Sequence, residues 1–276
     1  MRILICTDGS KEAEQAAKFI SLMNFEKDTH ITVLSVLESD GTKAHLQESI
    51  DRILDIFDKE KYHLSTKIRK GESVEQILQE TKETTYDLVT IGASGHHRGF
   101  LLINIGSTSQ KLARKLEANF LVVRRVPEKI HKVLICTAAE EPSLETLNTA
   151  AQLLKQVEAD LDVLHVMSQV ALKPDSPDQD LLDTAETAMA RGTREGKHLQ
   201  TAIQILKEAG ITRTINPILR HGLVVDEVLE QVKEGNYDLL VVGAHHQPGR
   251  SKWLEMLLDD VTDQLLRDAA CSVMVV

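Results

Sequence analysis

Residues 3–23 read "ILICTDGSKEAEQAAKFISLM", an apolar run that passes through a polar turn into a helical pattern. The run at residues 3–6 has the length and composition of a buried strand. After the turn, small and apolar residues recur at spacings of three and four, as on one face of a helix. These residues are Ala13, Ala16, Ala17 and Ile20. A strand followed closely by an amphipathic helix predicts the start of a βαβ unit and hence an α/β fold.

The pattern occurs twice in the chain. "VLICTAAEEPSLETLNTAAQL" at 133–153 resembles the opening stretch, and "KGESVEQILQETKETTYDLVTIGASGHH" at 70–97 resembles "HGLVVDEVLEQVKEGNYDLLVVGAHHQP" at 221–248. Between these two anchors the second copy is about 21 residues longer. The extra residues fall in a polar stretch, for which we expect a loop and a lengthened helix. Two repeats of this size predict two similar domains, 1–127 and 128–276.

Each copy alternates short β-rich runs with helical patterns. In the first copy the expected strands are 2–6, 30–36, 63–69, 87–92 and 119–123. Right-handed crossovers then predict two flavodoxin-like or Rossmann-like doubly wound domains, each a five-stranded, mainly parallel sheet with helices on both faces. In such sheets ligands bind beyond the carboxyl ends of the strands, where the winding order reverses. "CTDGS" and the glycine-containing "IGASG" both fall at that edge, so a site is expected there.

Composition and charge exclude several classes of partner. The chain of 276 residues has 42% hydrophobic and 27% charged residues and a net charge of −10, which disfavours nucleic acid as a partner. Residues 1–127 hold equal numbers of basic and acidic side chains, so the net negative charge lies in the second copy. No apolar run approaches the roughly 20 residues that span a bilayer. Three cysteines cannot all pair internally, which favours a reducing, cytoplasmic setting.

Both copies resemble universal stress protein domains over essentially the whole chain. The resemblance rests on the strand order, the opening "ILICTDGS" and the closing "GSTSQKLARKLEANFLVV". Members of the family that bind ATP carry a loop of pattern G-x2-G-x9-G-[S/T]. Gly92, Gly95 and the pair Gly106-Ser107 match it, with one residue more between the second and third glycines. The resemblance implies that the first domain binds ATP, with or without Mg²⁺.

The resemblance also assigns roles to residues of the first copy. The end of the first strand contacts the adenosine, a valine after the second strand packs on the base, and the glycine loop holds the ribose and phosphates. These positions carry Cys6, Thr7, Asp8, Val36, Ile91, Gly92, Gly95, Gly106, Ser107 and Thr108. Glycines let a backbone approach a phosphate, and amides at a helix start suit an anion. Read from the residues alone, the same loop also fits a simple turn with a serine N-cap.

The second copy has lost these features. Ala138 replaces the aspartate, His246 replaces the second glycine, and Asp259 and Asp260 stand where the Gly-Ser pair belongs. Carboxylates at a helix start suit the helix dipole but repel phosphate. We therefore expect one nucleotide per chain.

Other classes of function stay open. The pairs His96-His97 and His245-His246 have no cysteine or carboxylate at ligand spacing, so no metal site is expected. No catalytic residues are assigned. Besides an ATP-binding stress-response protein, the alternatives are a nucleotide-free interaction scaffold, an enzyme of adenylyl-transfer type and a slow ATPase. In the family, domains dimerise through their last strands. The resemblance implies that 119–123 and 271–276 pair in an intramolecular pseudo-dimer, with a homodimer as a further option.

Overall fold

The computed structural model describes residues 1–37, 43–93, 107–138, 141–167, 184–243 and 261–276. They form two compact units. Unit 1 comprises Met1–Lys129 with Leu266–Val275, and unit 2 comprises Ile130–Leu265 with Val276. Each is an α/β structure around a mainly parallel sheet, as predicted. Within the described ranges no helix is both long and apolar enough to cross a membrane.

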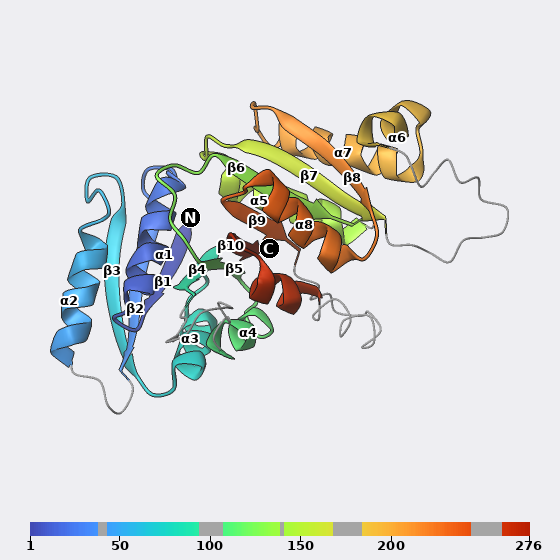
Figure 1. Ribbon diagram of the computed structural model, residues 1–276. Coiled ribbons are helices and arrows are strands. Elements are labelled where there is room, and N and C mark those ends of the chain that lie inside the picture. Colours follow the sequence, from blue (N-terminus) through green and yellow to red (C-terminus); the bar gives the residue numbers. More distant parts are fainter. Residues whose placement is uncertain (38–42, 94–106, 139–140, 168–183, 244–260) are drawn as a thin grey trace. The chain divides into compact units, whose positions relative to one another are not determined.

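Unit 1 contains every strand predicted for the first copy. Its elements are β1 (Arg2–Thr7), α1 (Lys11–Leu22), β2 (His30–Leu37), α2 (Lys43–Leu54), β3 (His63–Lys70), α3 (Ser73–Glu83), β4 (Leu88–Gly92), α4 (Ser107–Ala113), β5 (Asn119–Val123) and β10 (Ser272–Val275). The parallel strands lie in the order β3-β2-β1-β4-β5 (Figure 1). The winding order therefore reverses between β1 and β4. Right-handed crossovers place α1 and α2 on one face, and α3 and α4 on the other.

Unit 2 repeats this winding. Its elements are β6 (Lys132–Thr137), α5 (Glu141–Leu154), β7 (Asp160–Met167), α6 (Ala185–Arg191), α7 (Arg194–Glu208), β8 (Ile215–His221), α8 (Val224–Gly235) and β9 (Leu239–Val242). The strands are parallel in the order β9-β6-β7-β8. As in unit 1, the first strand lies between its second and fourth.

The insertion of the second copy differs from the single lengthened helix that we expected. Two helices, α6 and α7, are separated at Gly192, which has a positive φ of 66° that glycine adopts without steric cost. Thr193 caps α7 by accepting a hydrogen bond from the Gly196 amide at 3.1 Å. At Gly196 a Cβ would overlap the backbone carbonyl of Ala188, so this glycine lets the two helices pack closely. The spacing of apolar residues alone does not mark this turn.

The last strand of the chain belongs to unit 1. Residues of 271–276 form β10, which runs antiparallel to β5 in 119–123. Arg124, which follows β5, donates from its guanidinium to the carbonyl oxygens of Leu266 and Arg267 at the end of the helix formed by 261–268. The strand pairing and these hydrogen bonds explain why this segment joins unit 1, although it is the end of the second repeat.

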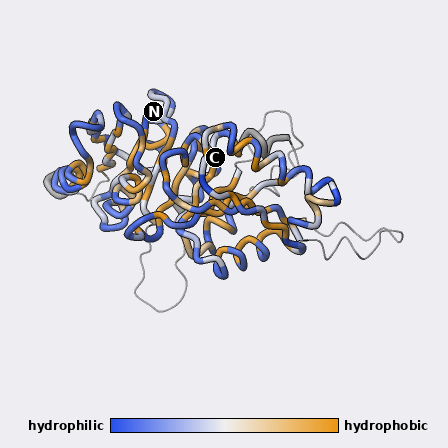
Figure 2. Tube along the Cα trace, turned by 90° about the horizontal axis from the view of Figure 1, so that it is seen from above, coloured by the Kyte–Doolittle hydropathy of each residue, from blue (hydrophilic) through white to orange (hydrophobic). Residues whose placement is uncertain are grey.

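The core follows the sheet strands. In β1, Ile3, Leu4 and Ile5 are fully buried, because helices cover both faces of the sheet. In Figure 2 the hydrophobic colour concentrates along the interior segments, while the outer turns of the helices are hydrophilic.

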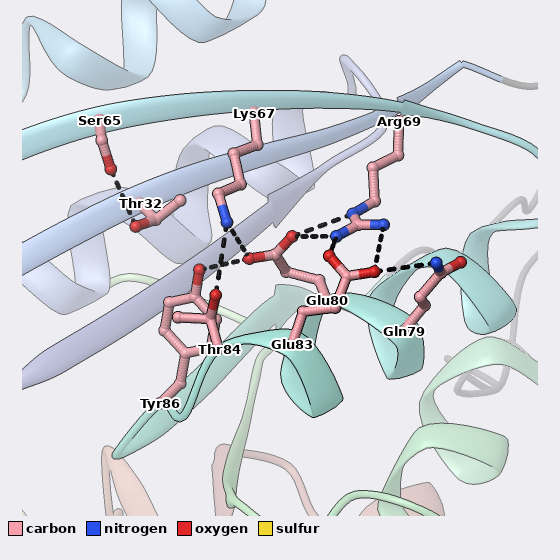
Figure 3. Close-up of polar contacts among 9 residues, drawn as sticks. All are labelled: Thr32, Ser65, Lys67, Arg69, Gln79, Glu80, Glu83, Thr84 and Tyr86. Carbon is pink, nitrogen blue, oxygen red and sulfur yellow. Dashed lines mark hydrogen bonds and ion pairs between the residues drawn. The ribbon is translucent and has the colours of Figure 1, made fainter.

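A buried carboxylate anchors α3 to the sheet of unit 1 (Figure 3). Glu80 of α3 is fully buried and accepts hydrogen bonds from Lys67 at 2.5 Å, from Arg69 at 2.7 Å and from the hydroxyl of Tyr86 at 2.8 Å. Burial alone would raise the pKa of Glu80, but these hydrogen bonds lower it below its usual value. Burial and the bond to Glu80 raise the pKa of Tyr86 to about 12. Glu80 is therefore ionised and paired.

Unit 2 has the same arrangement with the carboxylate on a different element. Tyr237, the counterpart of Tyr86, donates to Asp162, which lies on β7 and is 3% exposed. Lys132 forms an ion pair with Asp162 at 2.9 Å and lies over the ring of Tyr237. The helix position of the glutamate holds Gln231, which donates to the Tyr237 hydroxyl at 3.0 Å. In each unit a buried acid thus accepts a hydrogen bond from the tyrosine hydroxyl.

Candidate functional site

The turn after β1 is held by its own side chains. The amide of Gly9 donates to Thr7 Oγ1 at 3.0 Å, and the amide of Ser10 donates to Asp8 Oδ1 at 3.0 Å. Ser10 then caps α1 by accepting from the amide of Ala13 at 3.2 Å. Gly9 has φ of 87°, in the left-handed region that favours glycine. The sequence "TDGS" therefore folds locally and presents Asp8, which is exposed, at the edge of the sheet.

The end of β4 packs directly against the start of α1. A Cβ on Gly92 would lie 2.8 Å from the Ala13 amide nitrogen, and closer still to the carbonyl of Glu12. Both are backbone atoms, which cannot rotate away as a side chain does. Gly92 therefore has a packing role in addition to the ligand contact predicted from the sequence.

A pocket of about 280 Å³ opens where these two strands end, at the reversal of the winding order. Its wall is formed by β1 and the turn after it, the ends of β2 and β4, and residues of α1, α2, α3 and α4. The lining residues are Cys6, Thr7, Asp8, Ser10, Ala13, Val36, Leu37, Leu46, Ser73, Ile77, Ile91, Gly92 and Thr108. This is the edge at which the sequence predicted a site.

Most of the predicted site residues meet in this pocket. Those that line it are Cys6, Thr7, Asp8, Val36, Ile91, Gly92 and Thr108. Ser107 is the first residue of α4, and its side chain lies outside the described part of the chain. Gly95 and Gly106 also lie outside the described residues. The structure thus brings together residues that are up to about 100 positions apart in the sequence.

The helical part of the wall was not predicted from the sequence. Leu46 of α2 and Ile77 of α3 line the pocket, and Ser73 lies at the start of α3. Both apolar residues fall on the buried faces of their helices, so periodicity marks them only as inward-facing. Ser10 and Ala13 follow the predicted turn directly, and helix-start signals identify Ser10 as an N-cap.

Among the described residues that line the pocket, Asp8 is the single carboxylate, and none of them is a lysine, arginine or histidine. Burial, with a smaller contribution from Glu80, raises the pKa of the Cys6 thiol far above its usual range, so this side chain stays neutral. Thr7 also shares a hydrogen bond of 3.2 Å with Ser49 of α2, which is fully buried. Such a lining suits a flat, largely apolar group with hydrogen-bonding edges.

Metal binding is not indicated by the described residues. Among them, no group of three or more His, Cys, Asp and Glu side chains is arranged to hold a metal ion. The pairs His96-His97 and His245-His246 lie outside the described part of the chain.

The chain belongs to the universal stress protein family, whose model matches residues 1–124 and 129–276. The universal stress protein YxiE of Bacillus subtilis is 26% identical over 153 residues, which are 53% of this chain and 98% of that protein. The family, the tandem arrangement and the fold predicted from the sequence are therefore confirmed.

Solved structures agree with a two-domain fold. A universal stress protein from Archaeoglobus fulgidus superposes with a TM-score of 0.68 at 17% identity, covering 99% of this chain and 97% of that one. The functionally unknown protein PA1789 from Pseudomonas aeruginosa superposes with a TM-score of 0.69 at 14% identity, covering 100% and 92%. At these identities the likeness concerns the fold alone.

Proposed function

We propose that unit 1 binds ATP, with or without Mg²⁺, and that the chain is a cytoplasmic stress-response or regulatory protein. The observation that carries the proposal is the pocket at the reversal point, lined by Thr7, Asp8, Val36 and Ile91. Its volume of about 280 Å³ is near the lower end of ligand pockets, roughly 300–1,000 Å³. This volume suits a nucleoside, and the phosphates are assigned to the predicted glycine loop that ends at Gly106-Ser107, most of which lies outside the described residues. No residue is proposed as catalytic.

The expected result is that ATP stabilises the full chain. A ligand that binds only the folded protein adds about 2.7 kcal/mol to its stability at 100 times its Kd. A thermal-shift titration with ATP and Mg²⁺, together with mass spectrometry of nucleotide retained through purification, measures this. Unchanged melting up to millimolar ATP would refute nucleotide binding and favour an interaction scaffold.

Asp8→Ala tests the nucleoside end of the site. The substitution copies Ala138 of the second repeat and removes a carboxylate that would accept a hydrogen bond from the base. Loss of a charge-assisted hydrogen bond should weaken ATP binding roughly 10- to 100-fold in calorimetry. Asp58→Ala is a matched control, because Asp58 also accepts from an amide two residues on, that of Glu60 at 2.8 Å, and does not line the pocket. Equal losses in both variants would contradict the role of Asp8.

Gly106→Asp tests the phosphate end and the stoichiometry. The new carboxylate copies Asp259 and would oppose a phosphate by about 1–4 kcal/mol at a few ångströms. We expect native mass spectra with one ATP per wild-type chain and none on the variant, whose circular dichroism should be unchanged. Two nucleotides per wild-type chain would show that the second repeat also binds.

A further inference from the structure

In unit 2 two histidines lie around the threonine at the end of the first strand, where unit 1 has two serines. In unit 1, Thr7 lies opposite Ser35 on β2 and shares a hydrogen bond with Ser49 on α2. In unit 2 the corresponding threonine is Thr137, which lies opposite His165 on β7. Its hydroxyl is 2.9 Å from Nε2 of His198 on α7. Both units thus use a threonine at the end of the first strand to tie a helix to the sheet, but only unit 2 does so through imidazoles, which can take up a proton.

The two imidazoles are held in a defined arrangement. Nδ1 of His165 lies 3.0 Å from the carbonyl oxygen of Thr137. Because a carbonyl only accepts, this nitrogen carries a hydrogen and donates it. The ring centroids of His165 and His198 are 5.3 Å apart, with the rings tilted by 58°. His165 is 6% exposed and His198 is half-buried. The pair therefore joins α7 to both β6 and β7.

Among the residues that the structure describes, little around the pair favours a positive charge. The charged groups that act on it are Arg194 and Glu195 at the start of α7, and His221 at the end of β8. The part of α5 with described side chains, residues 146–154, contains no charged residue. The other charged residues of the packed strands and of α6 either form ion pairs elsewhere or are exposed. Lys132 pairs with Asp162, and Arg220 pairs with Glu227. The exposed residues are Asp160, Glu186 and Arg191.

Burial is the main cause of a lowered pKa at both histidines. It lowers the pKa of His165, and together with the neighbouring His165 and Arg194 it lowers the pKa of His198 to about 4. A histidine in an unfolded chain has a pKa of about 6.5. The neutral forms therefore contribute stability that is complete above about pH 6.5 and is lost as the pH falls toward 4. A second proton would also place two like charges on adjacent rings.

We propose that His165 and His198 form a proton-operated latch, which holds α7 on the sheet of unit 2 when neutral and releases it when protonated. The device is independent of nucleotide binding in unit 1. It would make the helical layer of unit 2 respond to acidification, while the serines that lie around Thr7 in unit 1 provide no titrating group there.

Hydrogen–deuterium exchange of the full chain tests the latch. Between pH 7 and pH 5, the opening equilibrium of amides in 194–208 should rise about 20-fold through His198 alone, after correction for the intrinsic exchange rate. The amides of α2 in unit 1 should show no comparable change. An equal response in both units, or none in α7, would overturn the proposal.

The double variant His165→Asn with His198→Gln isolates titration from packing. Both amides retain a nitrogen near the original hydrogen-bonding position but do not titrate in this range. The variant should lose the pH response of α7. A matched control is His30→Asn with His63→Gln, which alters an exposed histidine pair of unit 1 with centroids 4.7 Å apart and should keep the response. An unchanged response in the first variant would overturn the latch. Should that variant not fold, NMR titration of wild-type His165 and His198 decides, since values near 6.5 would equally overturn it.

Discussion

Replacing Glu80 with alanine is expected to lower the free energy of unfolding by about 3–5 kcal/mol, the cost of removing one partner from a buried ion pair. Glu80 is fully buried, and its loss deprives Lys67, Arg69 and Tyr86 of a shared acceptor. Urea unfolding measures the change. The control is Glu83→Ala, which removes the other carboxylate that Arg69 contacts but from a half-exposed position, so a much smaller loss is expected.

The Glu80→Ala substitution should also affect the pocket. Glu80 lies on the same helix as Ile77, one turn further along, and Ile77 lines the pocket. Loosening this helix should therefore weaken nucleotide binding under conditions where the variant is still folded. A variant with wild-type stability would contradict the ion-pair network of Figure 3.

The second repeat suggests a second substitution that should compensate for the loss of Glu80. Asp162 occupies the position of Thr32, and Gln231 occupies that of Glu80. Thr32→Asp alone would place a second carboxylate beside Glu80, and Glu80→Gln alone would remove the buried carboxylate that pairs with Lys67 and Arg69. The double variant restores one acid beside Tyr86, so we expect a favourable coupling of about 0.5–3 kcal/mol in a double-mutant cycle. Additive losses would show that the two arrangements are not interchangeable.

Stability that depends on Glu80 should also depend on pH in a defined direction. Its pKa is lowered in the folded protein, so its contribution is present above the ordinary carboxyl value of about 4.3 and is lost as the pH falls through the lowered value. Glu80→Gln should therefore flatten the acid limb of the stability curve. This range lies below that of the histidine latch, so the two effects are separable.

Gly92→Ala is the second large effect that we expect. The new Cβ would press on backbone atoms of Glu12 and Ala13, and such overpacking costs about 1–3 kcal/mol. Because Gly92 also lines the pocket, ATP binding should weaken together with stability. Thermal unfolding and calorimetry measure both quantities.

Gly243→Ala is the matched control for this substitution. Gly243 follows the equivalent strand of unit 2, where the three described atoms nearest to a Cβ belong to the side chain of Thr146, the nearest at 2.9 Å. A side chain can rotate away, so the loss should be smaller. Equal losses at the two glycines would mean that the close approach of β4 to α1 is not what requires glycine at 92.

The sequence by itself determined the fold class, the repeat and the edge of the sheet that carries the pocket. These follow from local patterns: an apolar run predicts a strand, a stripe predicts a helical face, and parallel strands bring their carboxyl ends to one edge. For that reason the turn after the first strand and the loop after the fourth could be assigned to one edge, and the family resemblance then implied Thr7, Asp8 and Ile91 as site residues. The ligand-binding roles of these residues stay predictions, and Gly95 and Gly106 also lie outside the described residues.

Only the tertiary structure decided which helix residues complete that site and which groups form ion pairs with one another. Leu46 and Ile77 belong to ordinary amphipathic stripes, and a stripe does not distinguish a core-facing side chain from one that lines a pocket. The buried acid beside the tyrosine is Glu80 on a helix in unit 1 and Asp162 on a strand in unit 2. Pairing depends on distance in space across elements, which local sequence does not specify. For the same reason the contact between His165 and His198 could not be predicted from the sequence. The two residues are 33 positions apart in the chain and meet because α7 packs on β7.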